Sequence, residues 1–150
     1  MQSKKTSLSS ITSLYTHPSA ILFRAIELRT IYNLTKGINF HHPSLDLGCG
    51  DGKIANLLFD EPFTFGLDNG EAKDVEDAIK NKYYDEVLIE SAEKISLQSK
   101  SLNFIFSNCV IEHIPNNDDV LSETSRILKQ GGYFLYTVPS HNFAEYLYLS

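Results

Sequence analysis

The feature that most constrains this chain is the stretch L-D-L-G-C-G-D-G at residues 45–52, which places glycine at positions 48, 50 and 52. An apolar run precedes the glycines, and Ile54, Leu57 and Leu58 follow them at helical spacing. Glycine adopts positive φ angles readily and lets a ligand approach the backbone closely. The stretch therefore predicts a strand, a tight turn that could bind a ligand, and a helix, in that order.

The same alternation of elements continues along the chain. Helical spacing predicts helices over residues 18–34, 53–59, 72–83 and 118–128, the last ended by Gly131-Gly132. Short apolar runs predict strands over residues 44–47, 63–67, 86–89, 102–107 and 133–138. Strands separated by amphipathic helices favour an α/β fold with a Rossmann-like, doubly wound, mainly parallel sheet. In such sheets ligands bind beyond the carboxyl ends of the strands, which directs attention to residues 48–52, 68–69, 91–93, 108–113 and 139–141.

Length and charge narrow the possible functions. The 150 residues suit one domain, predicted over residues 14–150, after a Ser/Thr/Lys-rich flexible tail at residues 1–13. The net charge of −6 argues against a nucleic-acid partner, which would require a basic surface. No apolar run is long enough to span a membrane. The two cysteines, Cys49 and Cys109, form neither a disulfide framework nor a metal motif, so we expect no metal site and a cytoplasmic location.

The spacing of the glycines separates the nucleotide sites that such a loop could form. A triphosphate loop needs G-x-x-x-x-G-K-[ST], which is absent, and a dinucleotide fingerprint reads G-x-G-x-x-G rather than the G-x-G-x-G found here. Asp51 would also repel a pyrophosphate. Asp68 ends the second predicted strand, where a carboxylate can accept hydrogen bonds from both ribose hydroxyls. An adenosine cofactor without phosphates fits best, with a nicotinamide-dependent oxidoreductase and a plain tight turn as the alternatives.

At this point the chain resembles the class I S-adenosylmethionine-dependent methyltransferases, in particular the methyltransferase type 11-like group. The resemblance runs from about residue 44 to residue 140. It is carried by L-D-L-G-C-G-D-G, G-L-D-N, S-A-E-K-I-S-L-Q-S-K-S-L-N-F-I-F-S-N-C-V-I-E-H-I-P and R-I-L-K-Q-G-G-Y-F-L-Y-T-V-P-S. It implies S-adenosylmethionine as cofactor and methyl transfer to a small molecule or a biosynthetic intermediate.

The resemblance also implies which residues meet the cofactor. The first glycine loop would line the methionine moiety, the end of the second strand would hold the ribose and adenine, residues 91–93 would meet the adenine edge, and the end of the fourth strand would lie under the methionine end. The residues are Asp46, Gly48, Cys49, Gly50, Gly52, Asp68, Asn69, Ser91, Ala92, Glu93, Asn108 and Cys109. His113 is a candidate general base, and local packing in a turn is its alternative role; no other catalytic residue is identified.

The family's sheet has seven strands, whereas this sequence predicts five, so the last two would be missing and the domain incomplete. Substrate contacts in the family lie largely in that region and in N-terminal additions such as residues 18–34. A second hypothesis is therefore a truncated, non-catalytic module that binds the cofactor or a partner. An exposed sheet edge would suit a homodimer or a partner subunit.

Overall fold

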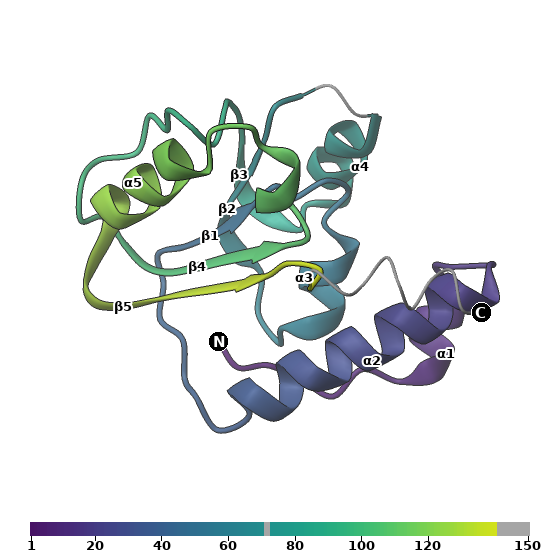
Figure 1. Ribbon diagram of the computed structural model, residues 1–150. Helices are drawn as coiled ribbons and strands as arrows, with labels where there is room; N and C mark the ends of the chain where they lie inside the picture. Colours follow the sequence, from purple (N-terminus) through teal and green to yellow (C-terminus); the bar gives the residue numbers. More distant parts are fainter. Residues whose placement is uncertain (71–72, 141–150) are drawn as a thin grey trace.

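In the computed structural model, five parallel strands form one sheet in the order β3-β2-β1-β4-β5 (Figure 1). The structure describes residues 1–70 and 73–140, so that His141, the last residue of the predicted range 139–141, lies outside the described residues. The strands are β1 (Ser44–Leu47), β2 (Phe63–Asp68), β3 (Tyr84–Ile89), β4 (Leu102–Asn108) and β5 (Leu128–Thr137). The helices are α1 (Leu8–Thr12), α2 (Pro18–Thr35), α3 (Lys53–Leu58), α4 (Lys73–Asn81) and α5 (Asn117–Ile127), with a 3-10 turn at Ile111–His113.

Both faces of the sheet are covered, because successive side chains of a strand point to opposite faces and those on each face are largely apolar. In β4, Phe104 and Phe106 join a core with α1, α2 and α3, whereas Ile105 joins a second core with α5. Phe40 stacks on Phe104 in the first core, with 4.1 Å between the ring centroids. Figure 1 shows α2 and α5 on opposite sides of the sheet. The predicted α/β, doubly wound, parallel architecture is confirmed.

The order in which the chain adds strands to the sheet reverses between β1 and β4. From β1 the chain proceeds outward to β2 and β3, and it then returns to place β4 on the other side of β1. Loops that leave β1 and β4 therefore diverge and leave a crevice at their carboxyl ends. This arrangement positions the glycine loop and residues 108–113 next to each other.

The end of α5 differs from the expectation. The sequence predicts that Gly131-Gly132 ends the helix, but α5 ends at Ile127 and β5 begins at once at Leu128. The glycines instead lie inside β5, where the pairing with β4 shifts register between Leu102 and Phe104. Gly131 has a φ of 80°, so the strand absorbs extra residues at this irregularity. The helix predicted over residues 72–83 covers Lys73–Asn81, and residue 72 lies outside the described residues.

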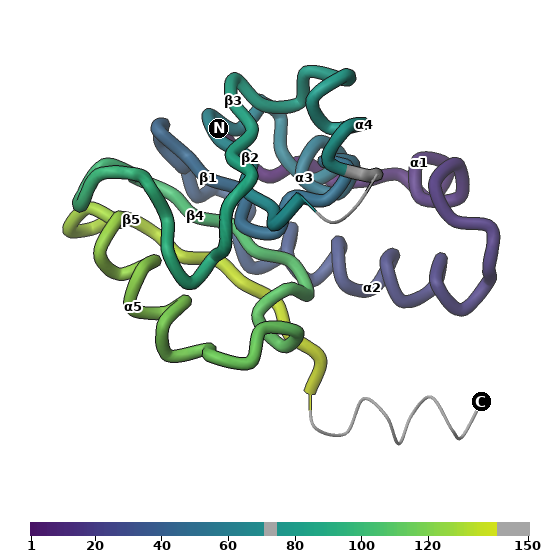
Figure 2. The backbone as a smooth tube through the Cα atoms, turned by 90° about the horizontal axis from the view of Figure 1, so that it is seen from above, coloured from purple at the N-terminus to yellow at the C-terminus, as the bar shows by residue number. Residues whose placement is uncertain are grey.

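The N-terminal segment also differs from the flexible tail expected for residues 1–13. Met1 and Ile11 are buried, and Ser3 forms an antiparallel bridge with Phe59. Lys4 donates its backbone N–H to a carbonyl at the end of α3, at 2.7 Å. Figure 2 shows α1 next to the beginning of α2, and the two helices are in contact. Local polarity predicted a tail, whereas a few apolar side chains and backbone hydrogen bonds attach the segment to the domain.

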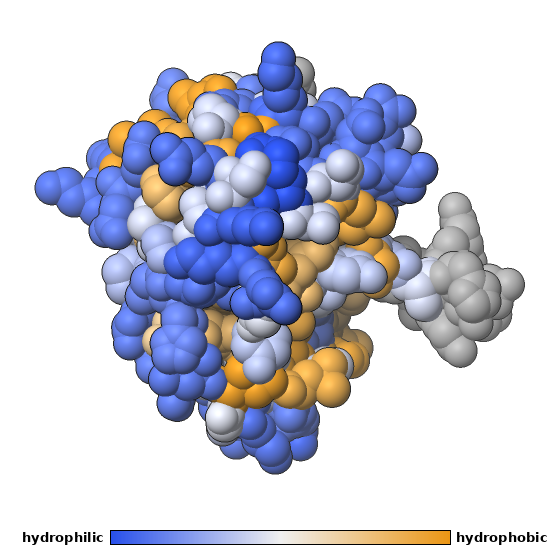
Figure 3. Space-filling view, turned by 90° about the vertical axis from the view of Figure 1, so that its left-hand side faces the viewer, coloured by the Kyte–Doolittle hydropathy of each residue, from blue (hydrophilic) through white to orange (hydrophobic). Residues whose placement is uncertain are grey.

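The described helices include none that is long and apolar enough to cross a membrane. Figure 3 views the end of the molecule that lies at the left of Figure 1, away from the carboxyl ends of β4 and β5. Hydrophilic side chains cover most of that end, with hydrophobic patches between them. The crevice at the opposite end of the sheet is therefore the first place to look for a site.

Candidate functional site

The glycine loop is held in a backbone conformation that side chains disfavour. Gly48, Gly50 and Gly52 have φ angles of 75°, 49° and 76°. A Cβ atom on Gly48 would lie 2.3 Å from a methyl group of Val110, so the turn after β4 packs directly against the loop. The backbone N–H groups of Gly48 and Cys49 both donate to the carbonyl of Leu67, at 2.7 and 3.0 Å. These contacts fix the loop at the ends of β1, β2 and β4.

Asp68 connects the glycine loop to the end of β2. Its Oδ2 atom accepts a hydrogen bond of 3.0 Å from the backbone N–H of Gly50. The next residue, Asn69, and Asp68 itself both line a cavity of about 250 Å³ beside the loop. The carboxylate therefore lies where the sequence places it, at the mouth of a ligand-sized cavity.

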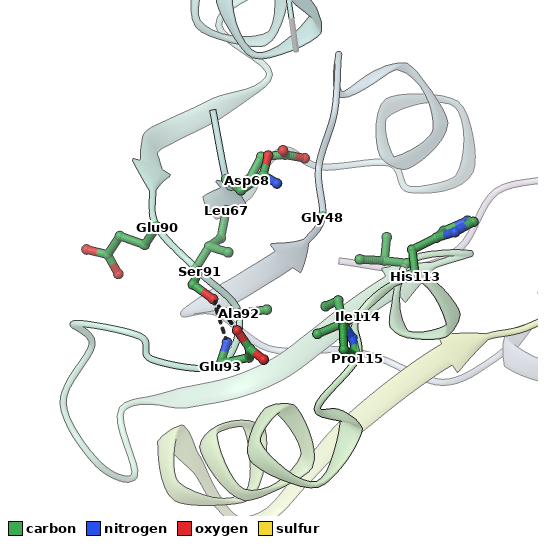
Figure 4. A pocket seen from close by; sticks show the side chains of 12 residues that line it. Gly48, Leu67, Asp68, Glu90, Ser91, Ala92, Glu93, His113, Ile114 and Pro115 are labelled. Carbon is green, nitrogen blue, oxygen red and sulfur yellow. Dashed lines mark hydrogen bonds between the residues drawn. The ribbon is translucent and has the colours of Figure 1, made fainter. Parts of the chain in front are cut away.

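We call this space beside the glycine loop the first cavity. The segment after β3 forms its far wall (Figure 4). Ser91 accepts a hydrogen bond from the backbone N–H of Glu93 and donates one to the Glu93 carboxylate, both at 3.2 Å. Val110, Ile114 and other apolar residues from the turn after β4 complete the wall. The lining residues are Gly48, Leu67, Asp68, Asn69, Glu90, Ser91, Ala92, Glu93, Val110, His113, Ile114 and Pro115.

A second cavity of about 260 Å³ lies on the other side of the glycine loop, under α2. Gly48 lines both cavities, so the two meet at the loop. Asp46, Asp51 and Arg24 bring charged groups to the second cavity. Its lining residues are Tyr15, Arg24, Asp46, Gly48, Cys49, Gly50, Asp51, Ile54, Ala55, Phe106 and Asn108. One elongated ligand could therefore pass the glycine loop and occupy both spaces.

Asp46 is a buried carboxyl group at the floor of the second cavity. Its Oδ2 atom accepts a hydrogen bond of 2.6 Å from the hydroxyl of Tyr84. Burial, together with the nearby charge of Asp68, raises the pKa of Asp46 to about 7, against the lowering effect of the Tyr84 hydrogen bond. A cation placed in the cavity would favour the charged form of this group.

A polar network joins α2 to the ends of β4 and β5. The carboxylate of Glu27 accepts hydrogen bonds from Arg24 at 2.6 Å, from Asn108 at 2.7 Å and from Thr137 at 3.3 Å. Arg24 also donates to the amide oxygen of Asn108, at 3.1 Å. The helix is thereby fixed over the second cavity by contacts between residues that lie far apart in the sequence.

Both cysteines are free thiols whose surroundings disfavour the thiolate. Burial, followed by the hydrogen bond to Glu27, raises the pKa of Cys109 to about 11. Burial, followed by the charge of Asp46, also raises the pKa of Cys49. A thiol with a raised pKa is a poor nucleophile at neutral pH, so neither cysteine is suited to covalent catalysis.

His113 lies at the rim of the first cavity, and its side chain is 78% exposed. Its Nε2 atom lies 3.9 Å from a carboxylate oxygen of Glu112. Figure 4 shows the imidazole directed away from Ser91 and Glu93. The ring borders the cavity that holds Asp68 rather than the one that holds Asp46.

Ten of the twelve predicted cofactor residues line one of the two cavities, whereas Cys109 and Gly52 line neither. The Cys109 thiol donates to the carboxylate of Glu27 at 3.2 Å. Gly52, the first residue before α3, lies against Tyr83 and Tyr84 instead, because a Cβ there would approach both rings to 3.0 Å or less. Sequence reasoning missed Val110, Arg24 and Glu27. The helical spacing of residues 18–34 predicted an apolar stripe, but it carried no signal that Arg24 and Glu27 would face this crevice. Among the described residues, no group of three or more potential metal ligands is found.

Comparison with known proteins gives a consistent result. A protein-family profile described as a methyltransferase domain matches residues 39–147. The ubiquinone biosynthesis O-methyltransferase of Vibrio atlanticus is 24% identical over 131 residues, which cover 82% of this chain and 54% of that enzyme. The arsenite methyltransferase of Mus musculus is 29% identical over 108 residues, covering 59% of this chain and 28% of that enzyme. The chain thus spans about half the length of the first of these relatives, and less of the second.

A solved structure extends the similarity to three dimensions. The S-adenosylmethionine-dependent methyltransferase of Thermotoga maritima, described as a possible histamine N-methyltransferase, superimposes with a TM-score of 0.67. It is 25% identical, and the match covers 83% of this chain and 57% of that one. The glycine loop, the first cavity and the five strands lie within the residues matched by the family profile, whereas α2 and two residues that line the second cavity, Tyr15 and Arg24, precede them.

Proposed function

This chain belongs to the methyltransferase-domain family, whose cofactor is S-adenosylmethionine, and from that premise we propose that it transfers a methyl group to a small molecule. We assign the cofactor to the two cavities that meet at Gly48, within a domain spanning residues 14–150. The observation that carries this proposal is that two cavities meet at one glycine loop, the first partly apolar with the carboxylate of Asp68 and the second with charged groups of both signs.

The residues fit an adenosine sulfonium in both halves of the site. In our assignment, Asp68 accepts hydrogen bonds from the ribose hydroxyls, with Asn69 beside the adenine. Residues 91–93 border the adenine edge, and Ile114 packs near it. The left-handed Gly48 and Gly50 allow the backbone to approach the ligand where a side chain would obstruct it. The carboxylates of Asp46 and Asp51 suit a cationic ligand and disfavour a phosphate.

The cofactor supplies an electrophilic methyl group, activated by the positive charge on sulfur. The protein's contribution is to align the acceptor with that methyl group and to exclude water, which is worth up to roughly 7–11 kcal/mol in favourable cases. In this proposal Asn108 and the turn after β4 border the methyl-transfer position. A general base is required only for an acceptor that is protonated at neutral pH, and His113 remains a predicted candidate for that role.

Calorimetric titration with S-adenosylmethionine and S-adenosylhomocysteine tests the cofactor assignment. We expect Asp68→Asn to weaken both by about 10- to 100-fold, because a charge-assisted hydrogen bond contributes about 1.5–3 kcal/mol. Asp85→Asn, at an exposed position on β3, is the matched control and should bind like the wild type. No heat of binding by the wild type at millimolar ligand would refute the assignment.

The second candidate function is a non-catalytic module that binds a partner. Its support is β5, an edge strand among the described residues, which carries the exposed side chains of Tyr133 and Tyr136 and is followed by the exposed Val138. Size-exclusion chromatography with light scattering separates the two candidates when it is combined with the titration. A dimer that binds no cofactor favours the module, and a monomer that binds it favours the enzyme.

We also propose a cytoplasmic location. Both cysteines are free thiols, which agrees with a reducing compartment. Cell fractionation with an antibody against the chain tests this location, and recovery from a secreted fraction would contradict it.

A further inference from the structure

A third cavity, of about 220 Å³, lies between the N-terminal segment and α2. It shares no lining residue with the two cavities at the glycine loop, so the proposed cofactor site does not account for it. Figure 2 shows α1, which contributes to one wall, next to the beginning of α2. The lining residues are Lys5, Thr6, Leu8, Ile11, Ala25, Leu28, Arg29 and Tyr32.

The walls of the third cavity are largely apolar. Ile11 from α1 and Leu28 from α2 are buried, and Ala25 packs against the same core. Leu8 continues the apolar wall to the surface, where it is 62% exposed. Because burial of apolar surface is favourable, these walls suit an alkyl chain better than a sugar or a nucleobase.

Three side chains with hydrogen-bond donors border the same cavity. Lys5 and Arg29 are exposed cations, and Tyr32 contributes a phenolic hydroxyl. Over residues 1–70 and 73–140, none of these three side chains forms a hydrogen bond or an ion pair. Arginine presents a planar fork of donors and lysine presents three donors on one charge, and both match a carboxylate.

The N-terminal layer is basic, although the chain as a whole is acidic. Residues 1–36 hold five of the 13 Lys and Arg side chains but only one of the 19 acidic ones, Glu27. That carboxylate is already paired with Arg24, which lines the second cavity. The local charge therefore attracts an anion to the third cavity, even though the net charge of the chain is −6.

We propose that the third cavity binds an amphipathic monocarboxylate, such as a medium-chain fatty acid. The alkyl chain packs between α1 and α2, and the carboxylate meets the donors of Lys5, Arg29 and Tyr32. A neutral hydrocarbon would leave the two cations unused, and a small inorganic anion would leave the apolar walls in contact with water. The assignment uses no residue of the proposed cofactor site, so its test is independent of methyl transfer.

A series of ligands tests this inference on the wild-type chain by titration calorimetry, below the concentrations at which the ligands form micelles. We expect the affinity to rise from butyrate to hexanoate to octanoate by about 4-fold per added methylene, because each one is buried against the apolar walls. Octylammonium has a similar chain and the opposite charge, and it should bind at least about 10-fold more weakly than octanoate. Octanoate should also raise the melting temperature, since it binds only the folded chain.

Substitutions separate the effect of charge from that of shape. Arg29→Met and Lys5→Met each keep an apolar stem, and each should weaken octanoate by about 3- to 10-fold. Ala25→Leu fills part of the cavity and should weaken octanoate by at least about 10-fold. Lys4→Met and Lys36→Met remove the same charge from exposed positions that do not line the cavity, and they should leave the affinity within about 2-fold of the wild type.

Each outcome of these titrations bears on the inference. No heat of binding with millimolar octanoate, equal affinity for octanoate and octylammonium, or an equal loss in the control variants would overturn it. Binding to phosphatidylglycerol vesicles without binding of monomeric octanoate would assign the basic layer to a membrane surface and would equally overturn it. If a variant does not fold by circular dichroism, the ligand series on the wild type decides.

Discussion

Burial, neighbouring charge and the proposed ligand all act on the side chain of Asp46. Its carboxyl group is buried beside Tyr84 and near Asp68, and its pKa is raised to about 7. The folded protein therefore retains a proton that the unfolded chain releases near pH 3.8. At the residue scale, the buried carboxyl group that suits the second cavity to a cation therefore lowers the free energy of unfolding in neutral solution.

We predict that the free energy of unfolding decreases as the pH rises from about 4 to 7. In that range the folded state binds more protons than the unfolded state at Asp46, so deprotonation favours unfolding, by up to about 4 kcal/mol. Asp46→Asn removes this titration, and its pH profile should be flatter by that amount. Urea denaturation between pH 4 and 8 measures both profiles, with Asp85→Asn as the exposed control. Parallel profiles for the wild type and Asp46→Asn would contradict the prediction.

Two glycines of the same loop separate steric from conformational effects. Both Gly48 and Gly50 have positive φ, but a Cβ would meet Val110 at the first and open space at the second. Gly50→Ala should therefore cost only the left-handed conformation, about 1–2 kcal/mol. Gly48→Ala adds a clash and should cost roughly 2–4 kcal/mol. Urea denaturation compares them, and equal losses would show that the contact with Val110 relaxes freely.

At the scale of elements, the segment between β3 and β4 reaches the site without a helix of its own. Arg126 of α5 holds it by donating to the carbonyls of Ile95 and Leu97, at 2.7 and 2.9 Å. Glu123 pairs with Arg126 and accepts the backbone N–H of Ile95 at 2.9 Å. Because residues 91–93 border the first cavity, α5 fixes one wall of the site.

Glu123→Gln tests that attachment through its pH dependence. The hydrogen bond from Arg126 lowers the pKa of Glu123 to about 2, from 4.5. The stabilisation is therefore present above pH 4.5 and is lost as the pH falls toward 2. Since the pair is partly exposed, we expect a cost of about 1 kcal/mol at pH 7, decreasing at lower pH. Thermal unfolding at pH 7, 4 and 3 measures it, with Glu86→Gln on β3 as control; a constant difference would argue against the ion pair.

At the scale of the whole molecule, the N-terminal segment and the sheet form one packed unit. The terminal amine of Met1 donates to the carbonyl of Phe40 at 3.0 Å, and Phe40 itself stacks in the core of the sheet. Ile11 packs in the same core, next to α2. Because α2 carries Arg24, the segment supports the helix that borders the second cavity.

Deletion of residues 1–13 should therefore destabilise the domain. Full burial of an apolar side chain such as Ile11 contributes about 1.5–3 kcal/mol, so we expect a loss of at least about 2 kcal/mol. Chemical denaturation measures the loss, and Ile11→Ala distinguishes the buried side chain from the rest of the segment. Exchange of Leu8, which is 62% exposed, for alanine is the control. An unchanged stability after the deletion would restore the flexible tail that the sequence predicted.

The local pattern was sufficient for the loop and for the succession of elements. Apolar runs located β1 to β4 to within two residues but missed the first five residues of β5. The signal is clearest in β1 and β4, because a strand buried on both faces must be continuously apolar. The loop at residues 45–52 and the carboxylate of Asp68 were identified because their spacing within one strand-turn-helix unit is nearly fixed. The boundary at Leu128 was missed, since nothing local distinguishes a helix that turns directly into a strand from one that ends at a double glycine.

The sequence by itself thus determined the α/β fold, the glycine loop and some of the residues that line the first cavity, Asp68 and residues 91–93 among them. Only the tertiary structure decided that Asp46 is buried against Tyr84, and that Arg24 and Glu27 meet Asn108 across more than 80 positions of the chain. The physical reason is the range of the interactions. Backbone geometry and side-chain periodicity act over a few residues and are written in local patterns, whereas burial, charge pairing and cavity shape depend on which distant segments pack together.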